Sequence, residues 1–372
     1  MKSTDILVIG AGINGLASAL ALAEAGLSVR VIDSGPGGQE SSWAGAGILS
    51  ALPPWGYPGA VTDLIDYSLG LWPDWLSQLR QHSPVDPEYR PCGMWILDPA
   101  DPDAARAWCA AHPEEGTPAA YPATYPAAYN ASTPSAFWLP RVAQVRNPRL
   151  LAVLRDCAMA AGIDFVADNG LVDWATDPSG TRITAVQTAQ ARLTARHYVV
   201  AAGAWSQTLL GKLAAGMDVR PIRGQIALLS TPPGTLPHII LAGGHYLVPR
   251  QDGLVLVGST LEDCGFDKGT TAEARSELLA FAAQTSPALR DAPCIHHWAG
   301  LRPGSPANIP SIGRHPEVEN LYLNAGHFRY GVTMAPASAQ ILTDRILERA
   351  PQTDIAPYDW PVKAAPREAL LR

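Results

Sequence analysis

The stretch Ile6-Leu7-Val8-Ile9-Gly10-Ala11-Gly12-Ile13-Asn14-Gly15 decides the fold of this chain. Four consecutive apolar residues, as expected of a central parallel strand, lead directly into a GxGxxG pattern. In such a pattern the first glycine permits a tight turn and the second lets backbone approach a pyrophosphate. The third lets the following helix pack close to the strand. The stretch therefore predicts a strand, a glycine turn and a helix that together bind a dinucleotide.

The residues that follow complete one βαβ unit. Helix formers fill residues 16–25, Gly26 suits the C′ position, and residues 29–32 predict a second strand. Asp33 ends that strand 23 residues after Gly10, near the spacing at which a carboxylate accepts the ribose hydroxyls. The free N–H groups and positive dipole end of the helix N-terminus would face the phosphates.

The glycine motif does not decide between FAD and NAD, but residues 41–48 (SSWAGAGI) bear on the choice. A run of small residues lets backbone approach a flat, bulky ligand such as a flavin. A compact glycine-rich turn with no ligand is an equally good reading of this segment alone.

The remaining sequence predicts further elements. Asn147 is read as the N-cap of a helix whose first helical residue is Pro148 and which ends near Gly162. Residues 84–140 predict irregular connections and short helices. Strand patterns lie at 163–166, 183–187, 197–201, 225–229, 246–248, 254–257 and 321–323. Those between residues 221 and 260 suggest a mainly antiparallel sheet, and a last helix spans about 332–349.

Composition excludes several classes of protein. The 372 residues carry a net charge of −7 and no basic run, which argues against a nucleic-acid partner. We expect no membrane span, because no run of eighteen or more apolar residues lacks charges, and no signal peptide. The five cysteines are scattered without CxxC spacing. This pattern favours the cytoplasm and argues against a disulfide framework or any metal site of the zinc type.

Motifs spread along the chain carry a family resemblance. They are VVAAGAW (199–205), PIRGQ (221–225), YLVPR (246–250), VGST (257–260), WAGLRPG (298–304) and HFRYG (327–331). With the glycine motif, they make the chain resemble the D-amino-acid oxidase superfamily, most closely the glycine oxidases of the thiamine-biosynthesis type. WAGLRPG followed by HFRYG is far more specific than GxGxxG.

The resemblance implies an α/β fold in two domains. A discontinuous Rossmann-like FAD-binding domain would comprise residues 1–80, 141–220 and 295–372. A mainly antiparallel β-sheet substrate domain would be inserted as residues 81–140 and 221–294. FAD should be non-covalent, because no cysteine lies between residue 298 and the C-terminus.

The resemblance also implies roles for individual residues. Arg302, Tyr246 and Arg329 fall on substrate-binding positions. Cofactor-binding positions are Gly10, Gly12, Ile13, Asn14, Gly15, Asp33, Ser34, Ser41, Ser42, Ala46, Gly47, Ile48, Leu171, His327, Phe328, Arg329, Tyr330, Gly331, Val332 and Thr333. No catalytic protein residue is assigned, because the flavin accepts the hydride.

Physical reasoning about the substrate residues leaves alternatives open. The planar fork of Arg302 suits a substrate carboxylate, and we read AGLRPG as a rigid turn that would hold it. A structural ion pair is the competing interpretation for Arg302 and for Arg329, and Tyr246 has the pattern of an ordinary half-buried strand tyrosine. We also predict that Trp55 and Tyr57 form part of a lid over the pocket.

The implied reaction is FAD-dependent oxidative deamination of glycine or a similar small amine, such as sarcosine, a small D-amino acid or an N-substituted glycine. Hydride would leave the α-carbon, molecular oxygen would reoxidise the flavin, and the products would be an oxo-acid, ammonia or an amine, and hydrogen peroxide. The family analogy suggests a cytoplasmic homo-oligomer, with a tetramer as the expected form.

Three other functions are considered for this chain. A flavin-dependent dehydrogenase, hydrogen-cyanide-synthase-like, would pass electrons to a carrier other than oxygen. A flavin-binding subunit without turnover would not need both Arg302 and Tyr246. A plain NAD dehydrogenase would leave WAGLRPG and HFRYG unexplained.

Overall fold

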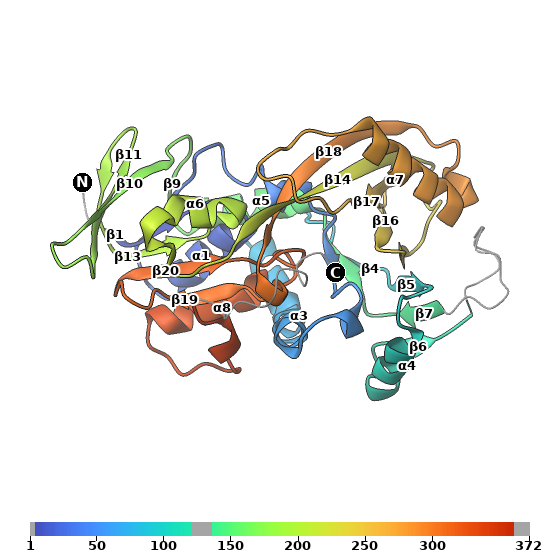
Figure 1. Cartoon of the computed structure of the whole chain (residues 1–372), viewed down its shortest axis with the longest axis horizontal. Helices are drawn as coiled ribbons and strands as arrows, with labels where there is room; N and C mark the ends of the chain where they lie inside the picture. Colours follow the sequence, from blue (N-terminus) through green and yellow to red (C-terminus); the bar gives the residue numbers. More distant parts are fainter. Residues whose placement is uncertain (1–3, 121–135, 361–372) are drawn as a thin grey trace.

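The computed structural model describes residues 4–120 and 136–360, and its N-terminal part is the expected βαβ unit (Figure 1). Strand β1 (Thr4–Ile9), helix α1 (Ile13–Glu24) and strand β2 (Val29–Ile32) follow one another, and the two strands pair in parallel. The predicted strand, glycine turn, helix and second strand are confirmed. Ile6 to Ile9 are all buried, as a continuous apolar run requires.

Within the described residues, β1 lies inside a six-stranded sheet that draws on the start, the middle and the end of the chain. The strand order is β19-β20-β13-β1-β2-β9, and only β19 runs antiparallel to its neighbour. The added strands are β9 (Asp164–Val166), β13 (Ala195–Val200), β19 (Ser311–Arg314) and β20 (Leu321–Ala325). Segments distant in sequence thus form one nucleotide-binding sheet.

Both faces of this sheet are covered. Ile6 and Val8 of β1 point into a core shared with helices α1, α3 (Gly59–Arg80), α5 (Asn147–Ala160) and α8 (Ala335–Ile346). Leu7 and Ile9 point to the opposite face, as the two-residue period of a strand dictates. There they pack with β10 (Leu171–Thr176), β11 (Ile183–Thr188), β12 (Arg192–Leu193) and α6 (Ser206–Leu210).

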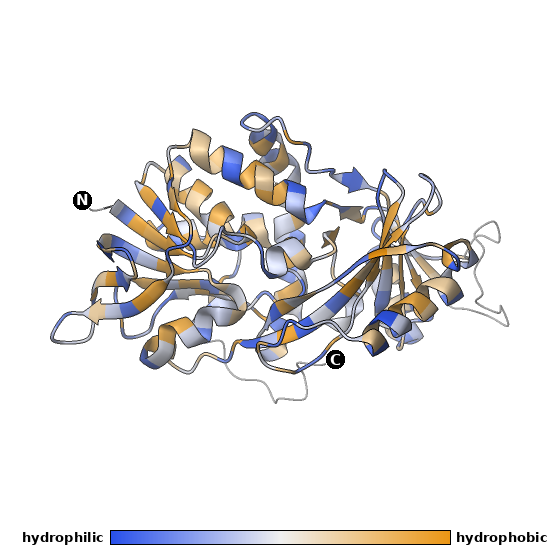
Figure 2. Cartoon of the chain, turned by 90° about the horizontal axis from the view of Figure 1, so that it is seen from above, coloured by the Kyte–Doolittle hydropathy of each residue, from blue (hydrophilic) through white to orange (hydrophobic). Residues whose placement is uncertain are grey.

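A second large sheet has eight strands in the described residues, in the order β18-β14-β17-β16-β15-β5-β7-β6. All its pairings are antiparallel except that of β15 with β5, which confirms the predicted mainly antiparallel sheet. Its strands are β5 (Met94–Leu97), β6 (Thr117–Pro118), β7 (Ala136–Leu139), β14 (Arg220–Ser230), β15 (Ile239–Ala242), β16 (His245–Pro249), β17 (Leu254–Gly258) and β18 (Cys294–Gly304). Helices α4 (Pro102–Ala111) and α7 (Ala272–Thr285) pack on it. Figure 2 shows apolar residues concentrated in the strands of both large sheets.

Shorter elements connect these layers. Strands β3 (Ile48–Leu49), β8 (Ala143–Gln144) and β4 (Arg90–Pro91) form a small sheet that begins just after helix α2 (Ser41–Ala44). Single 3-10 turns span Pro54–Gly56, Gly203–Trp205, Gly211–Ala214, Pro287–Leu289, Pro306–Asn308 and Ala356–Tyr358.

The interpretation of AGLRPG as a rigid turn is wrong. Residues 298–304 belong to β18, which pairs with β14 so that Arg302 faces Ile222. Glycine and proline suggested a turn because they usually interrupt strands. Here β18 is an edge strand, where Pro303 has no second neighbour to which it must donate a hydrogen bond. Arg302 is therefore held by a sheet.

Two predicted helix starts are also corrected. Helix α5 begins at Asn147 itself, with Arg146 as the capping residue, because the Asn147 side chain is engaged elsewhere. Helix α8 begins at Ala335, three residues after the predicted start at Val332. Segment 327–333 consequently forms a turn before that helix.

The predicted domain boundaries stay a prediction. Strand β18 begins at the proposed boundary near residue 294 and pairs along its length with β14 of the eight-stranded sheet.

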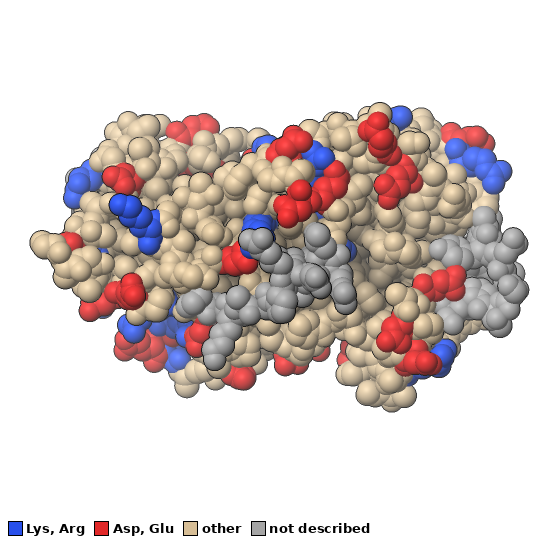
Figure 3. Space-filling view, viewed as in Figure 1, with Lys and Arg blue, Asp and Glu red and all other residues tan. Residues whose placement is uncertain are grey.

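In the described residues no helix has the length and hydrophobicity to cross a membrane. All five cysteines are free. On the face drawn in Figure 3, acidic and basic side chains are scattered among each other.

Candidate functional site

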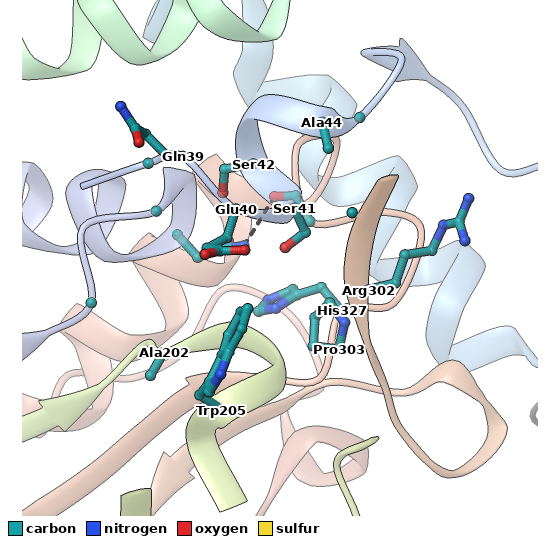
Figure 4. Close-up of a pocket in the computed structure, with 18 of the residues that line it drawn as sticks. Gln39, Glu40, Ser41, Ser42, Ala44, Ala202, Trp205, Arg302, Pro303 and His327 are labelled. Carbon is teal, nitrogen blue, oxygen red and sulfur yellow. Dashed lines mark hydrogen bonds between the residues drawn. The ribbon is translucent and has the colours of Figure 1, made fainter. Parts of the chain in front are cut away.

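A cavity of about 670 Å³ lies where the two large sheets meet. Residues at the ends of β1 and β2 line one part of it, and residues of β14, β16 and β18 line another. Figure 4 shows Ser41, Ser42 and Glu40 on one side, Ala202 and Trp205 across from them, and Arg302 at the opposite end from Gln39. The predicted cofactor and substrate residues thus converge on one cavity.

The glycines of the N-terminal motif shape the dinucleotide end of this cavity. A Cβ on Gly15 would lie less than 3.0 Å from the carbonyl oxygen of Gly10, so helix α1 approaches β1 only because residue 15 lacks a side chain. A Cβ on Gly12 would lie 2.9 Å from Ser42 Oγ. That hydroxyl accepts a hydrogen bond from the Ile13 N–H at 3.0 Å.

Helix α1 presents an anion site at this end. Gly12 provides no side-chain cap, and the first turn contains no acidic residue. The Ile13 N–H already donates to Ser42 Oγ, so the N–H groups of Asn14 and Gly15 and the positive dipole end are the features available to a phosphate. Asp33 lines the cavity beside them, where its carboxylate accepts hydrogen bonds from the N–H groups of Ala11 at 2.7 Å and Gly35 at 3.0 Å.

Most predicted site residues line the cavity directly. They are Gly10, Gly12, Asn14, Asp33, Ser34, Ser41, Ser42, Ala46, Gly47, Ile48, Leu171, Tyr246, Arg302, His327, Phe328, Arg329, Gly331 and Val332. The cavity is not lined by the other four predicted residues, Ile13, Gly15, Tyr330 and Thr333. Among these, the Thr333 hydroxyl donates to the Ile48 carbonyl at 3.1 Å, which connects the 327–333 turn to segment 46–48.

Arg302 is a cation without a protein counter-charge in the described part of the chain. Its guanidinium donates to Ser259 Oγ at 2.5 Å and to the Thr260 carbonyl at 3.2 Å, both neutral acceptors. Burial lowers the pKa of Arg302 to about 10, and Arg329 acts in the same direction, whereas Tyr246 favours the charged form. Arg302 therefore remains cationic at neutral pH, with charge free for an anionic ligand.

Two glycines make room for these side chains. A Cβ on Gly224 would lie less than 3.0 Å from three guanidinium atoms of Arg302. A Cβ on Gly258 would lie 2.7 Å from the Tyr246 hydroxyl. Bare backbone on β14 and β17 therefore seats Arg302 and Tyr246 in the cavity wall.

Arg329 and His327 lie in the 327–333 turn and line the cavity. The Arg329 guanidinium lies 5.3 Å from the Phe328 ring, and its Nε has no hydrogen-bond partner among the described residues. His327 contacts Ser338 Oγ through Nε2 at 3.0 Å, and burial lowers its pKa to about 3. His327 is therefore neutral in the folded protein, which agrees with leaving it without a role as a base.

Several lining residues were missed by sequence reasoning. Lys268 forms an ion pair with Glu40 at 2.9 Å and lies 5.9 Å from the Trp205 ring at the cavity rim. The Phe266 ring packs at a tilt against the Trp205 ring, with centroids 5.5 Å apart. Trp205 had a signal, since it ends the VVAAGAW motif, but the other three come from loops without recognisable patterns.

The predicted lid is not formed by Trp55. Its ring packs 5.8 Å from Trp108 and 5.7 Å from Phe137, and it does not line the cavity. Leu52 of the same segment does line the cavity. Tyr57 packs edge-on against Tyr330 at 5.1 Å.

Comparison with known proteins decides the family. Residues 5–345 match the family described as FAD dependent oxidoreductase (DAO). The chain belongs to this family. Its FAD-dependent relatives include proteins named glycine oxidase from Pseudomonas aeruginosa, 40% identical over 96% of this chain and 98% of the relative, and from Pseudomonas putida, 41% identical over 96% and 98%.

The fold of this FAD-dependent oxidoreductase agrees with a solved relative. The crystal structure of glycine oxidase from Geobacillus kaustophilus matches 98% of this chain and 100% of its own with a TM-score of 0.88 at 24% identity. The cavity also fits the cofactor. Its volume, its bare glycine turn, the N-terminus of α1 and the carboxylate of Asp33 suit a dinucleotide that carries a flat ring.

Replacement of Gly12 by valine should prevent FAD retention. The new side chain would meet Ser42 Oγ and occupy the space through which backbone approaches the pyrophosphate. We expect a folded, colourless protein, measured as flavin absorbance per chain together with circular dichroism. Gly70→Val is the matched control, because no atom lies within 4 Å of an added Cβ there. A Gly12→Val protein that purifies with full FAD would contradict the assignment.

Proposed function

We propose that this oxidoreductase oxidises glycine or a similarly small amine that carries a carboxylate. The products would be an oxo-acid, ammonia or an amine, and hydrogen peroxide. The observation that carries the proposal is the pairing of an uncompensated cation, Arg302, with the FAD-binding turn in a single cavity. The two Pseudomonas relatives named glycine oxidase, about 40% identical over nearly the whole chain, support it.

Arg302 and Tyr246 would bind the substrate carboxylate. A guanidinium can grip both carboxylate oxygens with its planar fork, and a tyrosine hydroxyl adds one donor. The bound cofactor FAD supplies a hydride acceptor that passes the electrons to oxygen. The apolar side chains of Ile48, Leu52 and Ile226 in the same lining would help to exclude water from the reacting carbon.

The positive charge of the site also acts on the substrate amine. Arg302 and Arg329 both line the cavity, and neighbouring positive charge lowers the pKa of an ammonium group. The amine would therefore lose its proton more readily in the site than in water, and the neutral amine is the form from which hydride can leave. No protein base is needed for this step.

Further parts of the proposal concern attachment and assembly. No cysteine of the described residues lines the cavity, which supports non-covalent FAD. Five free cysteines support a reducing cytoplasmic location. A homo-oligomer rests on family analogy alone.

Removal of the carboxylate clamp should abolish efficient use of glycine. Loss of one partner of a buried charge pair typically costs about 2–5 kcal/mol. Arg302→Ala should therefore reduce kcat/KM for glycine roughly 30- to several-thousand-fold, since 1.4 kcal/mol is about tenfold. Arg302→Lys should recover part of the loss, because it keeps the charge and loses the fork.

The assay is peroxide production in air, with FAD content measured in parallel. An amine without a carboxylate serves as the control substrate, because it leaves Arg302 no group to bind and should be affected much less. Equal losses on both substrates, with FAD retained, would show that Arg302 has another role.

Gly224→Ala should displace Arg302 without removing it. The methyl group would occupy the space of the guanidinium, so we expect KM for glycine to rise roughly tenfold or more while FAD content stays normal. Gly70→Ala, on an exposed helical position with open space, should change neither quantity. Steady-state kinetics of both variants test whether the space at Gly224 positions Arg302. An unchanged KM in Gly224→Ala would rule out that role for Gly224.

A further inference from the structure

Arg250 is a buried arginine that forms no ion pair in the described part of the chain. It follows strand β16 and is 6% exposed. Its guanidinium donates to the carbonyl oxygens of Ala46 at 2.8 Å and Val145 at 3.0 Å, and to the side-chain oxygen of Gln144. All three acceptors are neutral. A buried charge that bonds only neutral groups is costly, so its retention calls for a reason beyond packing.

The nearest carboxylates are engaged by another arginine. Arg146 pairs with Glu88 at 3.1 Å and with Asp252 at 2.8 Å. Burial lowers the pKa of Arg250 to about 10, and Arg146 acts in the same direction. Arg250 therefore carries a positive charge at neutral pH that is only weakly compensated.

One of its hydrogen bonds leads directly to the cavity wall. The Ala46 carbonyl and the Gly47 N–H belong to the same planar trans peptide, so the N–H points away from Arg250. Gly47 lines the cavity, and its N–H has no acceptor among the described residues. The Gly47 carbonyl in turn accepts the Val145 N–H at 2.9 Å, which fixes the orientation of the segment.

We propose that Arg250 is a positioning residue that tunes the bound flavin through this peptide. The charge of Arg250 polarises the Ala46–Gly47 peptide and strengthens the Gly47 N–H as a donor toward the cavity. A donor aimed at a ring that gains negative charge on reduction favours the reduced form. Arg250 thereby raises the reduction potential of FAD. The inference rests on the proposed placement of FAD against residues 46–48.

The test is the midpoint potential of FAD bound to the purified protein, titrated against a reference dye with no amine present. Arg250→Gln should lower the equilibrium constant for FAD reduction about tenfold, which is about 30 mV for a two-electron couple. Arg250→Lys should restore most of this loss, because it keeps the charge. Since no substrate is used, failure of glycine oxidation would not affect the result.

A second variant covers the case in which Arg250→Gln does not fold. Gln144→Glu places a carboxylate of the same size against the guanidinium and should lower the potential in the same direction. Arg90→Gln is the matched control, since this half-buried arginine donates to the Pro237 carbonyl at 3.2 Å and should leave the potential unchanged. An unchanged midpoint potential in FAD-loaded Gln144→Glu or Arg250→Gln would show that Arg250 has only a structural role and would overturn the proposal.

Discussion

The close approach of helix α1 to strand β1 is the constraint on which the rest of the site depends. The absence of a side chain at Gly15 allows that approach, and the resulting turn places Gly12 and the first N–H groups of α1 at the cavity. Asp33 secures the turn from β2 by accepting the Ala11 N–H. A larger residue at position 15 would separate helix α1 from strand β1 and remove the anion site. The other residues that line the cavity could not compensate for this loss.

Sequence reasoning succeeded where the signal was local. The β1–α1–β2 unit follows from an apolar run, three glycines and an aspartate within about thirty residues, each with its own physical requirement. It failed at β18, because glycine and proline in WAGLRPG have turn propensity, whereas the strand is stabilised by pairing with β14, some eighty residues earlier. Asn147 shows the same limit, since its amide donates to the distant Ser42 carbonyl at 2.8 Å and does not cap its own helix.

The end of the cavity at Arg302 depends on contacts that no short pattern encodes. The guanidinium of Arg302 fits because Gly224, on the neighbouring strand, has no side chain. The rim joins Glu40 to Lys268, which are 228 positions apart. The family motifs indicate Arg302 and Tyr246 from sequence alone. Only the structure shows the space around them and the arginines that have no carboxylate partner. Neither Arg302 nor Arg250 forms an ion pair in the described residues. Arg302 lines the cavity, whereas Arg250 does not.

The order in which the chain supplies these walls bears on biosynthesis. In chain order the glycine turn comes long before strand β18 and the 327–333 turn, so it leaves the ribosome before them. A nascent chain therefore has a nucleotide-binding turn long before it has a closed pocket. A cavity that encloses FAD therefore needs β18 and the 327–333 turn, and the six-stranded sheet is complete only once β19 and β20 have been made. Interrupted synthesis would thus release colourless fragments with exposed β-sheet edges, which are substrates for proteolysis and aggregation.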